Sequence, residues 1–180
     1  MQTTLKLIAI GLLPFLAVSA DVKNVDAFAW SDLELRIGID AENRVDIRSY
    51  EMIATLSSPW SWTVREKYEM DLGFEFGLGV LDGEGETAVF GHIGPSLGVS
   101  LGDLLPLGFV ISSGPALLSE HAFSDLDLGG TFQFISAVGF DYAVTEDWNI
   151  GYRYLHISNA GLHDKNPGMN LHAATVSHNF

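Results

Sequence analysis

The stretch from Lys67 to Val80 constrains the fold more than any other part of the chain. Apolar side chains occupy every second position, and the positions between them carry charged residues or glycine. The apolar set is Tyr68, Met70, Leu72, Phe74, Phe76, Leu78 and Val80. Because successive side chains point to opposite faces of a β-strand, this period of two predicts a long strand with one apolar face and excludes a helix.

Similar alternation recurs along the chain and predicts eight strands. They lie at about residues 32–40, 44–56, 66–81, 86–101, 107–119, 128–142, 147–158 and 169–180. Turn-forming residues separate the strands, and among these turns we place Ser57-Ser58-Pro59. Several of the strands are longer than the roughly 5–6 residues usual in soluble sheets. They match instead the roughly 9–11 residues of a tilted membrane strand.

Glycines indicate which way the apolar faces point. A soluble lipocalin-like barrel points them inward, and an outer-membrane barrel points them outward. Gly73, Gly77 and Gly79 lie on the polar face of their strand, where the narrow interior of an eight-stranded barrel would crowd larger side chains. This placement favours an all-β fold, an eight-stranded antiparallel transmembrane β-barrel.

The polar faces would then line the barrel interior. Side chains are expected to fill an interior of this size, without an aqueous channel. The inward-facing acids of the third strand would be Glu69, Asp71 and Glu75. Because an unpaired buried charge is costly, we expect Arg36, Arg48 and Arg153 to face these acids.

The N-terminal residues predict export. Lys6 precedes an apolar run, and Val18-Ser19-Ala20 fits a small-residue cleavage site. The run is shorter than the roughly 20 residues of a membrane-spanning helix, so a cleaved signal peptide is favoured over a membrane anchor. We expect residues 1–20 to be the signal peptide and residues 21–180 to form one β-barrel domain in the cell outer membrane.

Composition excludes several classes of function. Acidic residues outnumber basic ones by 23 to 9, which gives a formal net charge of −14. Nucleic acids are bound by basic surfaces, so this charge argues against a nucleic-acid partner. The chain has no cysteine, which excludes disulfides, a thiol nucleophile and thiolate metal ligands. We expect neither a metal nor a cofactor.

The end of the seventh predicted strand carries a pattern that indicates ester hydrolysis. His156 and Ser158 are two residues apart, so on a strand they share a face. A neutral imidazole can take the proton of a serine hydroxyl. Asn159 and Asn166 can donate N–H groups to an oxyanion, and Gly161 allows close approach of the backbone. Because this face is otherwise apolar, the pattern predicts a hydrolase whose substrate arrives from a membrane.

These residues resemble a known family. The segments His156-Ile-Ser-Asn-Ala-Gly161 and Asn166-Pro-Gly168, with the terminal strand to Phe180, are similar to the PagL lipid A deacylases of Gram-negative outer membranes. The likeness is specific over about residues 115–180 and architectural before them. It implies an ester hydrolase that removes the acyl chain at the 3 position of lipid A, with serine as nucleophile, histidine as base and no metal. The partner would be the lipopolysaccharide of the outer leaflet.

One position departs from the family pattern. Asn170 stands twelve residues after the serine, where the best-known members carry a glutamate. An amide can still orient an imidazole, but it lacks the charge that stabilises an imidazolium. We therefore predict His156, Ser158 and Asn170 as the catalytic residues, with this exchange able to weaken the activity. The alternatives are a catalytically silent outer-membrane barrel with a structural or lipid-binding role and, more distantly, a soluble ligand carrier. A homodimer stays open.

Overall fold

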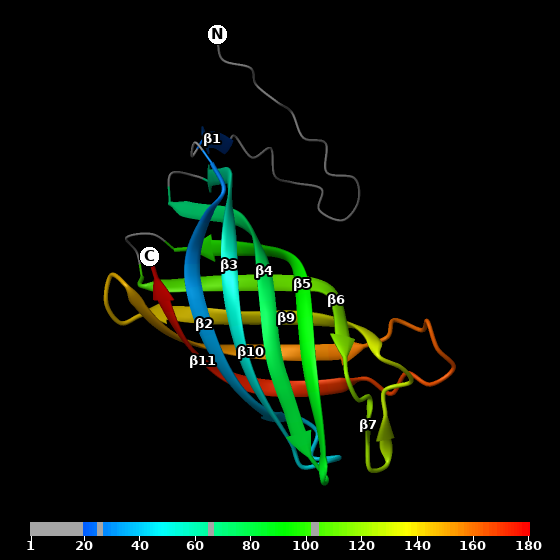
Figure 1. Ribbon diagram of the computed structural model, residues 1–180. Coiled ribbons are helices and arrows are strands. Elements are labelled where there is room, and N and C mark those ends of the chain that lie inside the picture. The colour runs from blue at the N-terminus through cyan, green and yellow to red at the C-terminus, as the bar shows by residue number, and fades with distance from the viewer. Residues whose placement is uncertain (1–19, 25–26, 65–66, 102–104) are drawn as a thin grey trace.

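The structure, a computed structural model, describes residues 20–24, 27–64, 67–101 and 105–180 (Figure 1). The predicted signal peptide lies outside these residues except for Ala20, so its fate stays a prediction. No helix in the described ranges is long and apolar enough to cross a membrane. The strands are β1 (Ala20–Asn24), β2 (Ala29–Asp40), β3 (Ile47–Val64), β4 (Tyr68–Gly83), β5 (Glu86–Ser100), β6 (Leu107–Leu118), β7 (Ala122–Phe123), β8 (Leu126–Asp127), β9 (Phe132–Ala143), β10 (Trp148–Ser158) and β11 (Met169–Asn179).

Eight of these strands form one closed antiparallel barrel, which confirms the predicted fold class. Around the barrel the order is β2-β3-β4-β5-β6-β9-β10-β11, and β11 pairs with β2 to close it. The short strand β1 pairs with the far end of β3, and β7 and β8 form a separate small hairpin. Within the described residues, closure gives each of the eight long strands a partner on both sides.

The two ends of the barrel differ. The C-terminus, β1 and the turn between β9 and β10 lie at one end, which we call the terminal end (Figure 1). The opposite end carries the loops 41–46, 119–131 and 159–168, and we call it the loop end. Outer-membrane barrels have short turns at the periplasmic end and longer loops at the cell surface. The loop end therefore corresponds to the cell-surface end of such a barrel.

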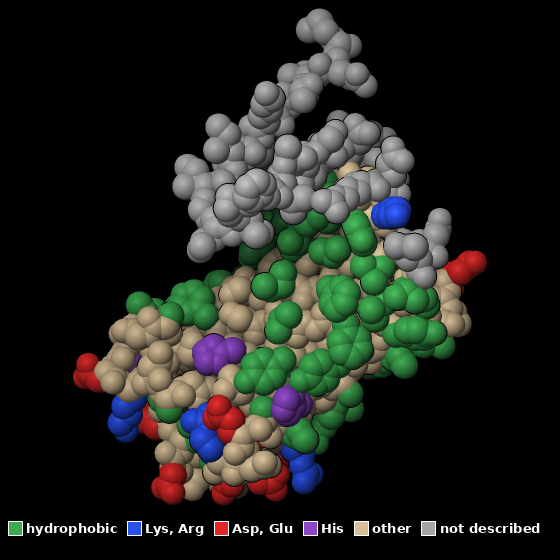
Figure 2. All heavy atoms as spheres, turned by 180° about the vertical axis from the view of Figure 1, so that it is seen from behind, with side chains coloured by type: hydrophobic (Ala, Val, Ile, Leu, Met, Phe, Trp, Pro, Cys, Tyr) green, Lys and Arg blue, Asp and Glu red, His purple; other side chains and the backbone are tan. Residues whose placement is uncertain are grey.

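Large apolar side chains cover the outside of the barrel, as the glycine pattern predicted. Ile37, Leu78 and Ile150 are 61%, 59% and 53% exposed. Figure 2 shows hydrophobic side chains over the waist of the molecule, with charged groups gathered mainly near one end. An apolar band of this extent is stable in contact with lipid chains, whereas water would disfavour it.

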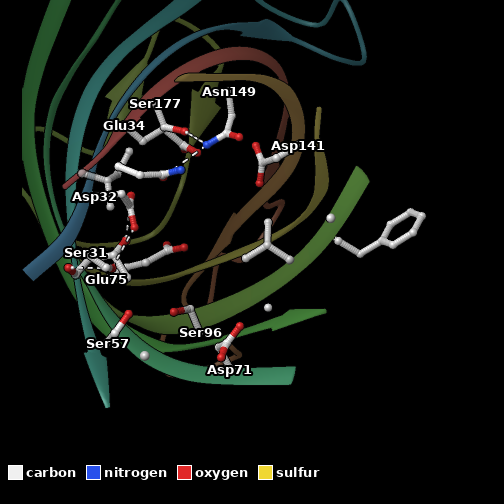
Figure 3. Close-up of a pocket in the computed structure, with 18 of the residues that line it drawn as sticks. Ser31, Asp32, Glu34, Ser57, Asp71, Glu75, Ser96, Asp141, Asn149 and Ser177 are labelled. Atoms are coloured by element: carbon white, nitrogen blue, oxygen red, sulfur yellow. Dashed lines mark hydrogen bonds between the residues drawn. The ribbon is translucent and has the colours of Figure 1, made fainter. Parts of the chain in front are cut away.

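The half of the interior near the terminal end is polar and charged. Arg36 contacts Glu34 and lies 3.4 Å from Glu75, and Arg153 contacts Glu34 and lies 2.9 Å from Asp141. These groups line a cavity of about 340 Å³ (Figure 3). The expectation that side chains fill the whole interior is therefore wrong for this half.

The predicted pairing of interior charges is correct in part. Arg36 is buried and lies 3.4 Å from Glu75, as expected. Arg153 is also buried, but its partners are Glu34 and Asp141 and not the acids named in the prediction. Arg48 is different: its side chain is 59% exposed and lies 4.0 Å from Asp46. It occupies an outward position of β3, because the neighbouring Ile47 and Ser49 are the buried residues. The alternation of faces therefore excludes Arg48 from the interior.

The half of the interior near the loop end is apolar. We call it the apolar plug, and each of its residues is at most 9% exposed. Its members are Val45, Ile47, Leu81, Ala88, Phe90, Ala116, Leu118, Phe123, Leu126, Leu128, Ile135, Ala137, Leu155, Ile157, Met169, Leu171 and Ala173. The plug closes the interior just below the loops.

Strand β3 corrects one predicted turn. Ser57-Ser58-Pro59 lies within the strand, and the chain continues extended to Val64. The pairing with β4 shifts register between Ser57 and Ser61, which marks a β-bulge or irregularity. Proline has no N–H to donate to a neighbouring strand, so it is tolerated where the ladder is interrupted in this way.

Candidate functional site

Two outward-facing side chains at the loop end of β10 form the centre of the site. His156 is exposed and Ser158 is partly buried, while Leu155 before them and Ile157 between them belong to the apolar plug. This alternation holds the strand by its apolar side and presents the polar side chains outward. The predicted sharing of one face by His156 and Ser158 therefore agrees with the burial pattern.

Asn170 lies beside the imidazole, on the neighbouring strand. It is the cross-strand partner of His156 in the pairing of β10 with β11. The distance from His156 Nδ1 to Asn170 Oδ1 is 2.7 Å. An amide oxygen can only accept, so Nδ1 donates the hydrogen and Nε2 keeps its lone pair. An imidazole in this tautomer has the form required of a general base.

The serine is a neighbour of the imidazole without a hydrogen bond to it. Among the described residues, the Ser158 hydroxyl has no side-chain hydrogen bond. Catalytic hydrogen bonds are often long before substrate binds and shorten in the complex. On its other side, Ser158 is paired with Phe134 of β9, whose ring packs 5.3 Å from that of Phe132. Ser158 therefore has the imidazole of His156 on one side and the aromatic rings of Phe132 and Phe134 on the other.

The side chain of Asn159 holds the loop that follows the strand. It is fully buried, and its Nδ2 donates to the carbonyl oxygens of Leu128 and Lys165 at 2.8 and 2.6 Å. Its Oδ1 accepts from Gly161 N at 2.9 Å. Both amide hydrogens are thus engaged within the protein. This arrangement favours a positioning role for Asn159 over direct donation to a substrate.

The predicted residues Gly161 and Asn166 lie in the same loop. Gly161 has φ +79°, a left-handed conformation that glycine adopts without strain. Asn166 is exposed, and its Oδ1 accepts from the Asn159 backbone N–H at 3.1 Å. The amide nitrogen of Asn166 is left as a donor on the outside of the loop.

Gly168 lies against the edge of the imidazole. It has φ +66°, and a Cβ atom at this position would lie 3.0 Å from His156 Cε1. Any L side chain would therefore be strained and would press on the ring. The glycine allows the chain to enter β11 directly beside His156.

Two residues of the loop 41–46 complete the surroundings of the histidine, and the sequence did not identify them. Glu42 Oε1 accepts from Asn170 Nδ2 at 2.7 Å, and Glu42 Oε2 lies 2.6 Å from Arg44 Nε. Arg44 Nη2 donates to the carbonyl oxygen of Gly168 at 2.7 Å. Residues 42 and 170 are far apart in the chain, and only the closure of the barrel between β2 and β11 brings them together.

Serines extend this polar group around the outside of the barrel. Ser136 of β9 is the cross-strand partner of His156, and its hydroxyl lies 2.8 Å from that of Ser113 on β6. The sequence contained a signal for this, because Ser136 interrupts the apolar alternation of its strand. A polar row thus crosses an otherwise apolar surface at the height of the site.

An exposed ion pair ties together two loops at the loop end. Lys165 Nζ donates to Asp127 Oδ2 at 2.8 Å, and Asp127 Oδ1 accepts from the Gly129 N–H at 2.9 Å. These bonds, the one from Lys165 first, lower the pKa of the Asp127 carboxyl to about 2. Among the described residues, no group of three or more histidine or acidic side chains is arranged to hold a metal ion.

Comparison with known proteins gives one matching family. A family model described as lipid A 3-O-deacylase (PagL) matches residues 48–179. The match reaches well before residue 115, where the resemblance in the sequence became specific. The lipid A deacylase PagL of Bordetella bronchiseptica (strain ATCC BAA-588 / NCTC 13252 / RB50) is 36% identical over 67 residues, which are 37% of this chain. The matched part spans 38% of the length of that relative.

The fold is that of a solved outer-membrane enzyme. The crystal structure of the outer membrane enzyme PagL matches with a TM-score of 0.70 at 18% identity, covering 81% of this chain and 97% of that chain. Neisserial surface protein A matches with a TM-score of 0.45 at 13% identity, covering 85% and 96% of the two chains. Because the family model matches most of the sequence, this outer-membrane β-barrel belongs to the PagL family of lipid A 3-O-deacylases.

Proposed function

We propose that the protein hydrolyses the ester bond of the acyl chain at the 3 position of lipid A, with Ser158 as nucleophile and His156 as general base. The observation that carries this proposal is the 2.7 Å hydrogen bond from His156 Nδ1 to Asn170 Oδ1, with Ser158 on the same face of the barrel. Family membership supplies the substrate class. The location at the loop end suits a substrate held in the outer leaflet.

The reaction follows from the roles of these groups. His156 Nε2 takes the Ser158 hydroxyl proton as Oγ attacks the ester carbonyl, and Asn170 holds the ring in place. The tetrahedral intermediate collapses, and the imidazolium returns the proton to the leaving sugar oxygen. A water molecule then releases the fatty acid by the same steps and regenerates the serine.

Stabilisation of the oxyanion is assigned to Asn166. Its Oδ1 is occupied by the Asn159 backbone N–H, so its Nδ2 is the end of the amide that can donate to a substrate. Removal of one oxyanion donor typically lowers kcat by roughly 10²–10³-fold. Gly161 and Asn159 contribute by fixing the loop that carries this amide.

The surface beside the serine fits an acyl chain. The rings of Phe132 and Phe134 face outward next to Ser158, within the apolar band that lipid chains cover. A fatty acyl chain can therefore reach the serine laterally from the membrane. No aqueous cavity is needed for substrate entry.

Mass spectrometry of lipid A tests the proposal. Cells or vesicles that carry the folded barrel should show loss of one 3-O-linked acyl chain, and Ser158→Ala and His156→Ala should each abolish that loss. His178→Ala is a matched control, because His178 lies on β11 at the terminal end, packed on Trp148. Heat-modifiable migration on gels reports folding of every variant. Deacylation at the normal rate in either site variant would contradict the assigned roles.

A catalytically silent barrel is the competing function, and the neutral Asn170 in place of a carboxylate is the observation that favours it. The same spectra distinguish the two. An unchanged lipid A mass in membranes that contain folded wild-type protein would establish the silent barrel.

A further inference from the structure

The loop 41–46 is built to hold a carboxylate against the start of β11. The Asp40 side chain, largely buried at the end of β2, accepts the backbone N–H of Arg44 at 2.7 Å and that of Glu42 at 3.3 Å. The N–H of Ala41 donates to the carbonyl oxygen of Asn170 at 2.8 Å. These bonds fix the loop on both sides of Glu42. The Glu42 side chain is therefore placed by the fold.

A continuous set of hydrogen bonds runs from this carboxylate to the catalytic ring. Glu42 Oε1 accepts from Asn170 Nδ2, and Asn170 Oδ1 accepts from His156 Nδ1, both at 2.7 Å. On the far side, Arg44 bridges the Glu42 carboxylate and the Gly168 carbonyl, at 2.6 and 2.7 Å. In each of these contacts a hydrogen-bond donor faces an acceptor.

The chemistry of these groups allows only one arrangement of hydrogens. A carboxylate accepts and cannot donate, so it must face the NH₂ end of the Asn170 amide. The amide oxygen then faces His156, and the ring must carry its hydrogen on Nδ1. If the amide were reversed, its NH₂ would face Nδ1 and the hydrogen would move to Nε2. That tautomer cannot accept the serine proton.

We propose that Glu42 is a positioning residue of the site, which fixes the orientation of the Asn170 amide and through it the tautomer of His156. The inference rests on the proposed function for its catalytic consequence. It explains how an amide can serve at a position where the family uses a carboxylate. A carboxylate is symmetrical and needs no orientation, whereas an amide does.

Glu42 acts mainly by orienting the Asn170 amide, and less through the effect of its negative charge on His156. Its side chain is 42% exposed and is paired with Arg44, so its negative charge is partly neutralised and screened. Glu42 also lies outside residues 48–179, the region that matches the family model. The residue is therefore a feature of this chain that the family match does not assign.

Kinetics of lipid A deacylation in vesicles give the first test. Glu42→Leu removes the acceptor, so the Asn170 amide populates both orientations. Because only one orientation is productive, we expect kcat to fall at least roughly twofold with KM unchanged. Glu86→Leu is the matched control, because Glu86 is an exposed glutamate at the loop end of β5. It should leave kcat unchanged.

The same substitution made in an Asn170→Asp variant distinguishes two roles of Glu42, orienting the Asn170 amide and supporting the loop 41–46. Asn170→Asp places a carboxylate beside His156, so there is no amide for Glu42 to orient. The negative charge of Glu42 then only repels the carboxylate of the new side chain. In that background Glu42→Leu should leave kcat unchanged or raise it. An equal loss of kcat in both backgrounds would show that Glu42 only supports the loop, and no loss in either would remove it from the site.

Nitrogen NMR of ¹⁵N-histidine in the folded barrel reads the tautomer without any substrate. The His156 signal, assigned by its disappearance in His156→Gln, should show Nδ1–H in the wild type and a mixture of tautomers in Glu42→Leu. If Glu42→Leu does not fold, Glu42→Gln, which offers both a donor and an acceptor, should give the mixture. An unchanged Nδ1–H tautomer in the folded variants would overturn the inference. Absence of deacylation by the wild type, by contrast, would refute the proposed function and leave this result standing.

Discussion

The two halves of the barrel interior are built on different physical principles. Near the terminal end, Arg36 and Arg153 are buried among carboxylates around a cavity of about 340 Å³. Near the loop end, the apolar plug fills the interior with aliphatic and aromatic side chains. Buried charges need mutual pairing and tolerate an open space between them, whereas an apolar core is stabilised by dense packing.

The difference explains where the site lies. His156, Ser158 and Asn170 project from the outside of the apolar half, with Leu155, Ile157 and Leu171 directly behind them. Close packing behind a strand fixes the positions of the side chains in front of it. The ion pairs of the polar half lie away from the site, toward the terminal end.

The largest loss of stability should come from removing a charge from the polar half of the interior. Arg36→Ala leaves Glu34, Glu51 and Glu75 without their common partner, so the free energy of unfolding should fall by about 4 kcal/mol. Denaturant titration of the barrel in detergent or vesicles measures it. The exposed Arg48→Ala should change it by less than about 0.5 kcal/mol. Equal effects of the two variants would mean that the polar network does not stabilise the barrel.

A smaller loss of stability, with a larger loss of activity, should follow from a hole in the apolar plug. Leu171→Ala empties space behind Asn170 and should lower the free energy of unfolding by about 3 kcal/mol. Because β11 can then shift relative to β10, the rate of lipid A deacylation by the folded variant should fall too. Folded Arg36→Ala protein should keep its rate. If the two variants lose activity equally, the plug has no special relation to the site.

The smallest effect concerns the exposed ion pair between the loops, and it depends on pH. The pKa of Asp127 is lowered to about 2 by its bonds with Lys165 and the loop backbone, so these bonds stabilise the folded loops above the unfolded pKa of about 4. The contribution declines as the pH falls below about 4 and is lost below about 2. The protection of the amides in the loops 119–131 and 159–168 against hydrogen exchange, relative to an unfolded chain at the same pH, should fall over that range. Asp127→Asn should abolish this dependence on pH.

The fold followed from the sequence because alternation is a local property. Each long strand shows its period of two directly, and the glycines opposite Phe74 and Phe76 indicated which face points outward. The turn at Ser57-Ser58-Pro59 was wrong because proline also occurs where a strand pairing is interrupted. Local patterns do not distinguish the two cases.

The candidate site could be proposed from the sequence where its residues are near neighbours in the chain. His156 and Ser158 share a strand, and Asn170 begins the next one along the chain. Glu42 could not be found in this way, because its proximity to Asn170 depends on the register with which β11 closes on β2. That register is a property of the whole barrel. The role of the Asn159 side chain was likewise hidden, since its partners lie in two different loops.

Asn159 has a consequence for how the loops move. One buried amide donates to Leu128 in one loop and to Lys165 in the other, so neither loop can lift away without breaking its bonds. Segments that are joined by shared hydrogen bonds tend to open as one cooperative unit. We therefore expect the loops 119–131 and 159–168 to open together, because either movement requires the loss of hydrogen bonds made by one fully buried side chain.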